Sequence, residues 1–401
     1  MSKEKSVKVA VVGAGTAGIS IAARILRQAP YVKGDLLFID PAEVHYYQPA
    51  FSLVGAGDMK LDDTYRSMER AIPEGTELLK EHVATFQPEE NTLKTKEGTT
   101  VKYEYLVVAA GLQYDWDKIE GLTEALKAEG KNGVCSNYSP KTVEYTWTAL
   151  QNVNDGRAIF TQPSTPIKCA GAPQKIMYLT EEYLRKMGVR HKTAVEFISG
   201  MPKLFPVPRY YGPLKEIVKE RGIETTFSSE LRKIDGDKQI ATFENIETGE
   251  MFEREFSMIH VVPQMSAPDF IKESPLAKDG WVDVDMYTLR HNKYPNVFGA
   301  GDNSSLPTSR TGAAVRKQAP VAATNLVALM EGREMTAKYD GYSSCPLVTG
   351  YDKVMLAEFV YGNEASESTP LDQRVPRRSM FFMKKNLLPI LYWNGMLRGT
   401  M

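Results

Sequence analysis

The first forty residues alternate between apolar runs and a glycine-rich turn. Residues 7–12 are apolar and β-branched, which is typical of a buried parallel strand. A turn follows at residues 13–18, and the apolar-rich stretch 19–28 predicts a helix. A second apolar run at 36–39 ends at Asp40. Together these segments predict a βαβ unit at the start of the chain.

The later pattern predicts a second α/β unit inserted into the first. The segments 81–108 and 223–262 alternate as short strands, with turns at Pro88 and Gly98 in the first and a β-meander in the second. Between them we expect strands at 158–161 and 193–198 and helices at 174–186 and 214–221. A strand at 296–298 and a helix at 312–330 return to the first pattern, and 340–401 is aromatic- and Met-rich.

The expected fold class is therefore α/β, with two Rossmann-like dinucleotide-binding domains and an extra C-terminal element. A stretch rich in Gly, Lys and Glu at 119–133 is interpreted as the entry into the second domain. The predicted boundaries are 1–115 with 280–335 for the first domain, 116–279 for the second, and 336–401 for the C-terminal region.

The first glycine motif has the context of a dinucleotide site. Gly13 permits a tight turn, Gly15 permits a pyrophosphate to approach the backbone, and Gly18 permits close packing of helix and strand. The start of the helix then offers free N–H groups to phosphates. Asp40 follows about 20 residues later, where a carboxylate binds a ribose hydroxyl. The alternative, glycines in a plain turn, does not account for the strand, helix and acid together.

Composition narrows the classes of function. The chain has 49 Lys and Arg residues against 50 Asp and Glu, so it lacks the basic excess typical of proteins that bind nucleic acid. We expect no metal site. No apolar run reaches the ~18 residues of a spanning helix. The N-terminus leads directly into a strand, so we expect no signal or transit peptide. Only 3 cysteines are present, which favours redox chemistry over structural disulfides.

A second motif indicates which dinucleotide binds. Residues 294–302 (YPNVFGAGD) resemble the second FAD signature of the pyridine nucleotide-disulfide reductase superfamily, and 107–111 (VVAAG) resemble its middle motif ending at Gly111. The resemblance implies that Asp302 holds the sugar-phosphate arm of FAD, whereas a simple turn cap is the alternative role. The helix starting at Gly312 would direct its N-terminus toward the flavin ring and stabilise negative charge there.

The second domain lacks the motif that would bind a nicotinamide dinucleotide. After its first strand, residues 162–173 (QPSTPIKCAGAP) contain three prolines and a cysteine and no spaced glycine triplet. Cys169 stands in this strand-to-helix turn, where Lys168 and the helix start would lower the pKa of its thiol. A small buried hydrophobe is the alternative role. Cys345 lies in a turn-like stretch far downstream, so a redox pair requires the fold to bring the two together.

Long segments resemble the sulfide:quinone oxidoreductases, in the branch that includes the mitochondrial enzymes. The resemblance extends over essentially the whole chain. Its matching segments are 45–49 (HYYQP), 136–139 (SNYS), 165–175 (TPIKCAGAPQK), 339–351 (YDGYSSCPLVTGY) and 391–394 (LYWN).

The resemblance implies a redox cycle. Cys169 and Cys345 would form a sulfur-bridged pair beside FAD, and hydrogen sulfide would convert one cysteine to a persulfide. Electrons would pass through FAD to a membrane quinone, and the sulfur to a small acceptor such as a thiol or sulfite. Resemblance and glycine motifs together assign FAD contacts to Gly13, Gly15, Thr16, Ala17, Gly18, Asp40, Gln48, Val83, Gly111, Asp302, Gly312, Ala313, Ala314 and Val315.

Three features depart from the family pattern. Cys135 precedes Ser136, where mitochondrial-type members have another residue, and it is either an auxiliary redox cysteine or an incidental thiol. Arg316 and Lys317 stand where small apolar residues are usual, which would alter the flavin potential or the nearby surface. The chain ends at residue 401 where family members continue, so part of a membrane anchor is expected to be absent.

The C-terminal region combines apolar, aromatic and basic residues at 381–385 and 387–393. This mixture suits an element at the lipid interface, although the same residues could pack on the protein body. A quinone substrate favours a peripheral membrane location, on the cytoplasmic face in a bacterium or the matrix side in an organelle. Lys384 is a candidate for stabilising negative charge on flavin or quinol, with a surface lysine as the alternative.

Two other functions remain open at this point. One is a type II NADH:quinone oxidoreductase, which the missing glycine triplet disfavours. The other is an FAD-binding redox sensor, in which the cysteines are regulatory. A homo-oligomer is compatible with all of these.

Overall fold

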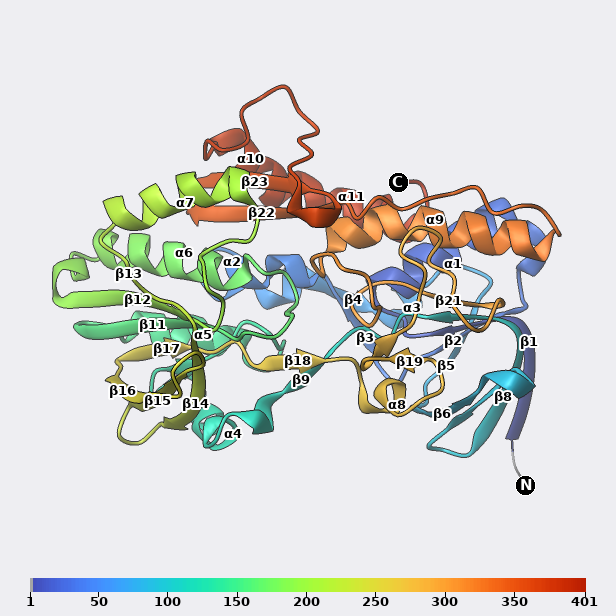
Figure 1. The fold of residues 1–401 in the computed structure, drawn as a ribbon, viewed down its shortest axis with the longest axis horizontal. Helices are drawn as coiled ribbons and strands as arrows, with labels where there is room; N and C mark the ends of the chain where they lie inside the picture. Colours follow the sequence, from blue (N-terminus) through green and yellow to red (C-terminus); the bar gives the residue numbers. More distant parts are fainter. Residues whose placement is uncertain (1–2) are drawn as a thin grey trace.

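The computed structural model describes residues 3–401 and contains two main sheets lying side by side (Figure 1), the first mixed, with antiparallel pairing only at β6, β7 and β8, and the second parallel. The first has the strand order β5-β2-β1-β8-β7-β6, and β21 pairs in parallel with the end of β8. Its strands are β1 Lys3–Val12, β2 Leu36–Ile39, β5 Glu77–Leu79, β6 Val83–Gln87, β7 Thr92–Thr95, β8 Thr99–Val108 and β21 Val297–Gly299. The predicted βαβ unit is therefore confirmed, and β21 returns from far along the chain.

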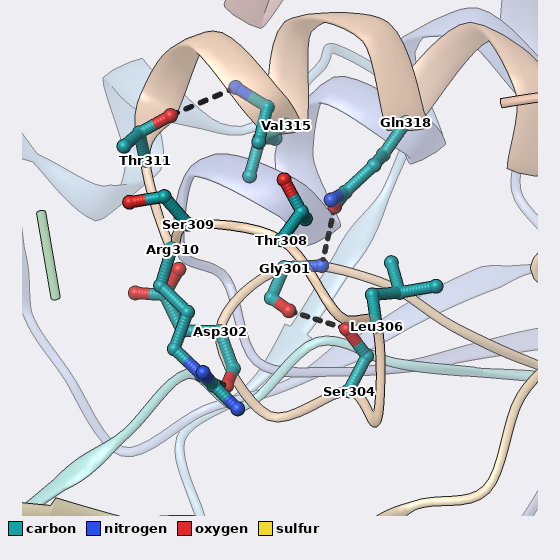
Figure 2. Close-up of a pocket in the computed structure, with 11 residues that line it drawn as sticks. Gly301, Asp302, Ser304, Leu306, Thr308, Ser309, Arg310, Thr311, Val315 and Gln318 are labelled. Carbon is teal, nitrogen blue, oxygen red and sulfur yellow. Dashed lines mark hydrogen bonds between the residues drawn. The ribbon is translucent and has the colours of Figure 1, made fainter. Parts of the chain in front are cut away.

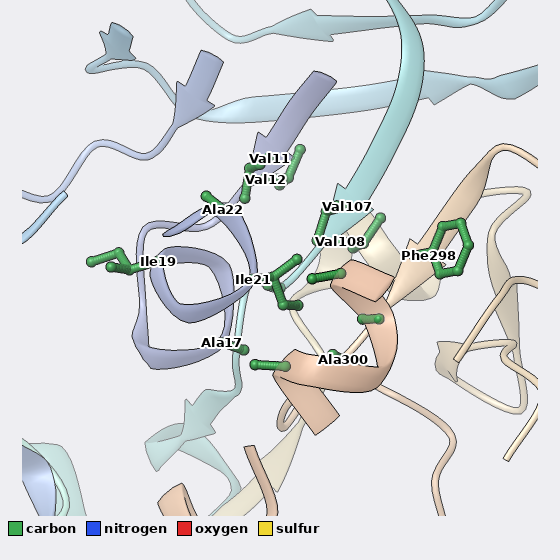
Figure 3. Close-up of a cluster of buried hydrophobic side chains, with 14 of the residues drawn as sticks. Val11, Val12, Ala17, Ile19, Ile21, Ala22, Val107, Val108, Phe298 and Ala300 are labelled. Carbon is green, nitrogen blue, oxygen red and sulfur yellow. The ribbon is translucent and has the colours of Figure 1, made fainter. Parts of the chain in front are cut away.

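Two helices, α1 (Thr16–Gln28) and α9 (Gly312–Met330), pack against each other beside this sheet. The central strands are buried on both faces, as expected for parallel strands covered by helices. Figure 3 shows Val11 and Val12 of β1, Val107 and Val108 of β8, and Ile21 of α1 in this core. Gly18 is required here because a Cβ atom would collide with the carbonyl oxygen of Gly13. This packing places the starts of α1 and α9 at the carboxyl ends of the strands.

The second sheet is parallel and has the order β10-β17-β11-β12-β13. Its strands are β10 Val134–Cys135, β11 Gly156–Gln162, β12 Thr193–Ser199, β13 Glu224–Thr226 and β17 Met258–His260, and its helices are α5 Val143–Gln151, α6 Ala172–Lys186 and α7 Pro208–Glu220. The helix predicted at 214–221 begins six residues earlier, because Pro208 suits a helix start and Pro213 removes only one backbone bond near that end.

Residues 223–262 do not form a single meander. Only β14 (Ser229–Asp235), β15 (Ile240–Asn245) and β16 (Met251–Glu255) form an antiparallel sheet. The strands on either side of them, β13 and β17, join the parallel sheet instead. The alternation of polar and apolar residues did not distinguish the antiparallel strands from the flanking parallel ones, because β13 and β17 are only three residues long.

The stretch 119–133, interpreted from the sequence as the entry into the second domain, packs against β14 and β15. Ile119, Leu122 and Ala125 recur at helical spacing and are buried against β14 and β15, so the segment packs as short helices. The chain crosses between the two sheets just before this stretch, on β9 (Gln113–Asp115), and returns on β18 (Gln264–Ser266), which pairs with β9.

The C-terminal region covers both units (Figure 1). The hairpin of β22 (Ser343–Gly350) and β23 (Lys353–Phe359) packs on α6. Next come α10 (Arg378–Phe382), a π-helical turn (Met383–Leu387), α11 (Leu388–Asn394) and a 3-10 turn (Met396–Arg398) that contacts α1. Within residues 3–401, no helix has both the length and the apolar character needed to cross a membrane.

The remaining elements are short. They are α2 Phe51–Val54, α3 Met68–Ala71, α4 Leu122–Ala125, α8 Asp269–Lys272, and the strand pairs β3 Val44–Tyr46 with β4 Tyr65–Ser67 and β19 Ala277–Lys278 with β20 Trp281–Val282.

Candidate redox site

Two cysteines that are 176 residues apart in sequence meet at the start of α6. Cys169 lies in the turn between β11 and α6, as predicted, with a left-handed φ of 52° and its N–H bonded to the Arg310 carbonyl. Non-glycine residues in this conformation are held by their surroundings and cluster at functional sites. Cys345 lies in β22 rather than in a turn. Pro346 suggested a turn in the sequence, but a two-stranded hairpin tolerates proline.

The two sulfur atoms are 3.6 Å apart, and both cysteines are free thiols. This distance exceeds the ~2.05 Å of a disulfide bond, so the sulfurs are in contact but not bonded. Gly171 makes the approach possible, because a Cβ atom there would meet the sulfur of Cys345 and the side chain of Leu347. The Nζ atom of Lys175 lies 3.2 Å from the sulfur of Cys169.

Charges around the sulfurs favour a thiolate at Cys169. A hydrogen bond from the Cys345 thiol lowers the pKa of Cys169 well below its usual value; burial opposes this, and Lys175 lowers the pKa further. The pKa of Cys345 is raised by the same hydrogen bond and by burial. Burial lowers the pKa of Lys384 to about 7, and the positive charge of Lys175 adds to the effect. Lys384 is thus buried and is not the surface lysine considered as its alternative role.

Lys168 forms no hydrogen bond with the thiol of Cys169, although the two groups interact electrostatically, so its predicted effect on the pKa of that thiol stays a prediction. Its Nζ atom forms an ion pair at 3.1 Å with Asp302, and this carboxylate raises the pKa of Lys168 against the effect of burial. The direct contact with the thiol comes from Lys175, in the first turn of α6.

Asp302 lies in the loop between β21 and α9 (Figure 2). The Nε atom of Arg310 donates to the backbone carbonyl of Asp302 at 2.9 Å, and the N–H of Gly301 donates to Gln318 at 2.8 Å. These bonds fix the loop, so Asp302 is a constrained and largely buried carboxylate. Its contact with the sugar-phosphate arm of FAD stays a prediction.

A cavity of about 370 Å³ connects the sulfur site to the C-terminal helices. It contains buried polar atoms with no partner in the described residues: Oε1 of Gln48, and both Oδ1 and Nδ2 of Asn137. Buried polar groups in folded proteins are almost always hydrogen-bonded. Unpaired atoms facing a cavity therefore fit a polar ligand such as a flavin. Among the residues predicted to bind FAD, Gln48, Gly312 and Ala313 line this cavity.

The glycine motif also fits a phosphate ligand. Gly13 has a φ of 97°, and no protein atom lies within 4 Å of a Cβ built on Gly15, so space is open at the start of α1. Asp40 accepts the N–H groups of Ala14 and Ala42 through its two oxygens, while burial raises its pKa. Thr16 bonds the hydroxyl of Tyr392 at 2.7 Å. FAD would therefore fit against α1 with Tyr392 covering its start.

Five other predicted FAD contacts are less accessible than expected, because their N–H groups are bonded or their side chains are buried. The N–H groups of Ala314 and Val315 are bonded to Thr311, through its side chain and its carbonyl respectively, so they are not available to a ligand. The Thr311 N-cap accounts for both, and the bond to its side-chain hydroxyl appears in Figure 2. The N–H of Gly111 is bonded to Asn303. Val83 and Ala17 are buried, and their contacts with FAD stay predictions.

Cys135 is separated from the redox pair. It lies on β10, fully buried, with its thiol directed to the Ile259 carbonyl at 3.5 Å. Burial raises the pKa of Cys135 to about 12. It does not line the cavity. This environment supports the incidental role rather than the auxiliary redox role.

The sequence interpretation missed Lys175 and Asn137 as site residues. Both fall in segments that carry the family resemblance, 165–175 and 136–139, so the signal was present. Lys175 is the fourth residue of α6. Side chains near a helix start lean back toward the preceding turn, which brings Lys175 to Cys169.

Comparisons with known proteins agree with this geometry. A model of the pyridine nucleotide-disulphide oxidoreductase family matches residues 7–143. The mitochondrial sulfide:quinone oxidoreductase of Mus musculus is 46% identical over 394 residues, covering 98% of this chain and 86% of that protein. The enzyme of the same name from Dictyostelium discoideum is 44% identical over 395 residues, with the same coverage.

A solved structure shares the fold. The sulfide:quinone oxidoreductase from Aquifex aeolicus superposes with a TM-score of 0.81 at 19% identity, covering 99% of this chain and 92% of that chain. The identities to the curated relatives, over nearly all of the chain, show the family. The chain belongs to the sulfide:quinone oxidoreductase family.

Proposed function

We propose that this chain oxidises hydrogen sulfide at Cys169 and Cys345 and delivers the electrons through FAD to a quinone. Family membership supports the reaction, and one observation carries it: Cys169 contacts Cys345 and lines one cavity together with the buried Lys175 and Lys384. The separation of 3.6 Å lies between one S–S bond of ~2.05 Å and twice that length. The pair can therefore close directly or hold one bridging sulfur after a small shift.

The cysteines carry the sulfur chemistry. Hydrosulfide attacks a sulfur of the oxidised pair, forming a new S–S bond as a persulfide on one cysteine and releasing the other as a thiolate. A thiol or sulfite then takes the outer persulfide sulfur and leaves a second thiolate. FAD, when bound, accepts the two electrons released as the cysteines are reoxidised and transfers them to the quinone. Cys169 is the residue suited to hold the thiolate, because its pKa is the lowered one.

Lys175 and Lys384 have separate tasks in this proposal. Lys175 contacts the Cys169 sulfur and stabilises its anionic form. Lys384 donates to the Pro49 carbonyl at 2.9 Å and lines the cavity. With a pKa near neutrality, it can supply either a positive charge or a proton to an anion in the cavity. Quinol formation requires protons, so Lys384 is proposed to supply one there.

We assign FAD to the cleft between the starts of α1 and α9, in the domain formed by residues 1–115 and 280–335. The residues 116–279 then serve as a support for Cys169. Residues 336–401 contribute Cys345 and the quinone side of the cavity. The membrane location proposed for the chain rests on four exposed apolar side chains near this side: Phe382, Leu387, Ile390 and Leu391. Leu391 also lines the cavity, so the apolar surface and the cavity are continuous.

An anaerobic titration of the FAD-loaded protein tests the function. Sulfide should bleach the oxidised flavin spectrum, and a soluble quinone should restore it. Bleaching by NADH but not by sulfide would support the alternative NADH:quinone oxidoreductase. A flavin that responds to neither donor would support the redox sensor.

A further inference from the structure

Arg316 presents unused hydrogen-bond donors to the cavity. It lies one turn of α9 beyond Gly312, is half-buried and lines the cavity. Its single side-chain hydrogen bond is a long one, 3.4 Å from Nη2 to the Tyr342 hydroxyl. Across residues 3–401, no carboxylate lies within 4.0 Å of its guanidinium. A guanidinium has five N–H donors, so most of them face the cavity or water.

The neighbouring carboxylate does not need Arg316. Glu358 accepts hydrogen bonds from the Tyr342 hydroxyl, from the N–H and hydroxyl of Ser368, and from Gln373 at 2.6 Å. Although burial opposes it, these bonds lower the pKa of Glu358, so this group stays anionic without an arginine. Tyr342 is fixed between Glu358 and Arg316. The guanidinium thus lies at the cavity wall beside the Tyr342 hydroxyl, with most of its donors free.

The hairpin separates Arg316 from the sulfur of Cys345. Side chains alternate between the two faces of a strand. Cys345 faces α6, where its sulfur meets Gly171. Ser344 and Pro346 line the cavity together with their cross-strand partners Glu358 and Leu356. A molecule held between this second face and Arg316 cannot attack Cys345, because the strand lies between them.

We propose that Arg316 fixes the head group of the quinone by donating to one of its carbonyl oxygens. The inference rests on the proposed function and deepens it. Gly312 and Arg316 are four residues apart, about 6 Å along the helix axis, so an electron acceptor beside a flavin at the start of α9 is within reach of the guanidinium. Pro346 and Leu356 supply an apolar wall for a planar ring, and Arg316 supplies the polar contact that orients it.

Steady-state kinetics of FAD-loaded Arg316→Ala, Arg316→Lys and Lys317→Ala variants test the proposal. Alanine is the best helix former, so the first substitution preserves α9. Lys317 is the matched control, because it also lies near the Tyr342 ring (5.5 Å) but is exposed and does not line the cavity. We expect Arg316→Ala to raise the KM for quinone about ten- to hundredfold, as for loss of a charged hydrogen bond. Arg316→Lys should recover part of that loss, and Lys317→Ala should match the wild type.

A second readout does not depend on turnover. The affinity of the oxidised holoenzyme for a redox-inactive quinone analogue, measured by calorimetry, should fall with the KM effect in Arg316→Ala. The rate of flavin reduction by sulfide in the same variant should match the wild type. Unchanged quinone KM and analogue affinity would overturn the proposal, as would an effect confined to the KM of the thiol or sulfite acceptor. Absence of sulfide-driven reduction in the wild type would instead refute the proposed function.

Discussion

The ammonium group of Lys175 lies 3.2 Å from the sulfur of Cys169 in the protein interior, where no carboxylate of residues 3–401 pairs with it. The contact raises the pKa of Lys175 above its usual value despite burial. A fixed positive charge is therefore available to the thiolate and is not neutralised by an acid.

Replacing this charge should make the thiol less acidic. In Lys175→Met we expect the pKa of Cys169 to rise by about one unit or more, because an opposite charge at contact distance is lost. Sulfide-driven flavin reduction at neutral pH should slow accordingly. The pH profile of iodoacetamide labelling at Cys169, followed by mass spectrometry, measures the shift. Lys186→Met, at an exposed position paired with Glu182, is the control. Identical labelling profiles for Lys175→Met and wild type would contradict the role.

The three cysteines should behave differently. Cys169→Ser and Cys345→Ser should each abolish sulfide-driven quinone reduction and retain FAD, because neither sulfur contributes to the glycine-motif cleft. Cys135→Ser should keep near-wild-type turnover, since its thiol is buried on β10 and its pKa is about 12. Turnover and flavin absorbance of the purified variants provide both readouts. Near-normal turnover of either member of the pair would refute the paired mechanism.

The sequence predicted elements that depend on local pattern, and missed contacts that depend on packing. The strand-glycine-helix order around Gly13 and the turn position of Cys169 were correct, because short-range periodicity and glycine spacing determine them. The strand at Cys345 was missed, since Pro346 resembles a turn signal until its pairing with β23 is known. Lys168 was preferred over Lys175 because chain neighbours are visible in a sequence and helix-to-turn contacts are not.

The open space at Gly15 gives a test of cofactor binding that separates folding from function. Its φ of −78° is accessible to any residue, and a Cβ atom there meets no protein atom within 4 Å. We therefore expect Gly15→Val to fold normally but to lose at least about tenfold in FAD affinity, because the side chain fills the phosphate space. Gly212→Ala, in α7 and equally free of contacts, should keep FAD and stabilise its helix. Flavin fluorescence titration and circular dichroism report the two effects. Equal FAD affinity in Gly15→Val and wild type would exclude the assigned cleft.

Lys384 should make stability depend on pH in a defined direction. Its pKa is about 7 in the folded chain against 10.5 as its ordinary value, so the unfolded chain binds one more proton between these limits. The contribution of Lys384 to the free energy of unfolding therefore rises with pH across that window. Below pH 7 the ammonium is charged in both states, and the full cost of burying that charge lowers the stability of the folded chain.

Lys384→Met removes this contribution. The difference in the free energy of unfolding between Lys384→Met and wild type should favour the variant most at pH 7. This difference should shrink by on the order of 2 kcal/mol by about pH 9. Urea unfolding midpoints of the holoenzyme at several pH values measure the difference, with Lys317→Met as the control for loss of a surface charge. Parallel pH curves for the wild type and Lys384→Met would contradict the shifted pKa.

The exposed apolar side chains of the C-terminal helices give the membrane prediction. Phe382 and Ile390 are 58% and 57% exposed, whereas Lys385 between them in sequence is half-buried and paired with Asp58. Burying each apolar side chain in lipid is worth about 1.5–3 kcal/mol, so Phe382→Ser/Ile390→Ser should lower vesicle binding at least about tenfold. Co-sedimentation with vesicles containing anionic lipid measures this binding.

The matched control, Met187→Ser/Met251→Ser, removes side chains that are 59% and 53% exposed on the second domain and should bind like wild type. Equal binding by both double variants would show that this surface does not contact the membrane.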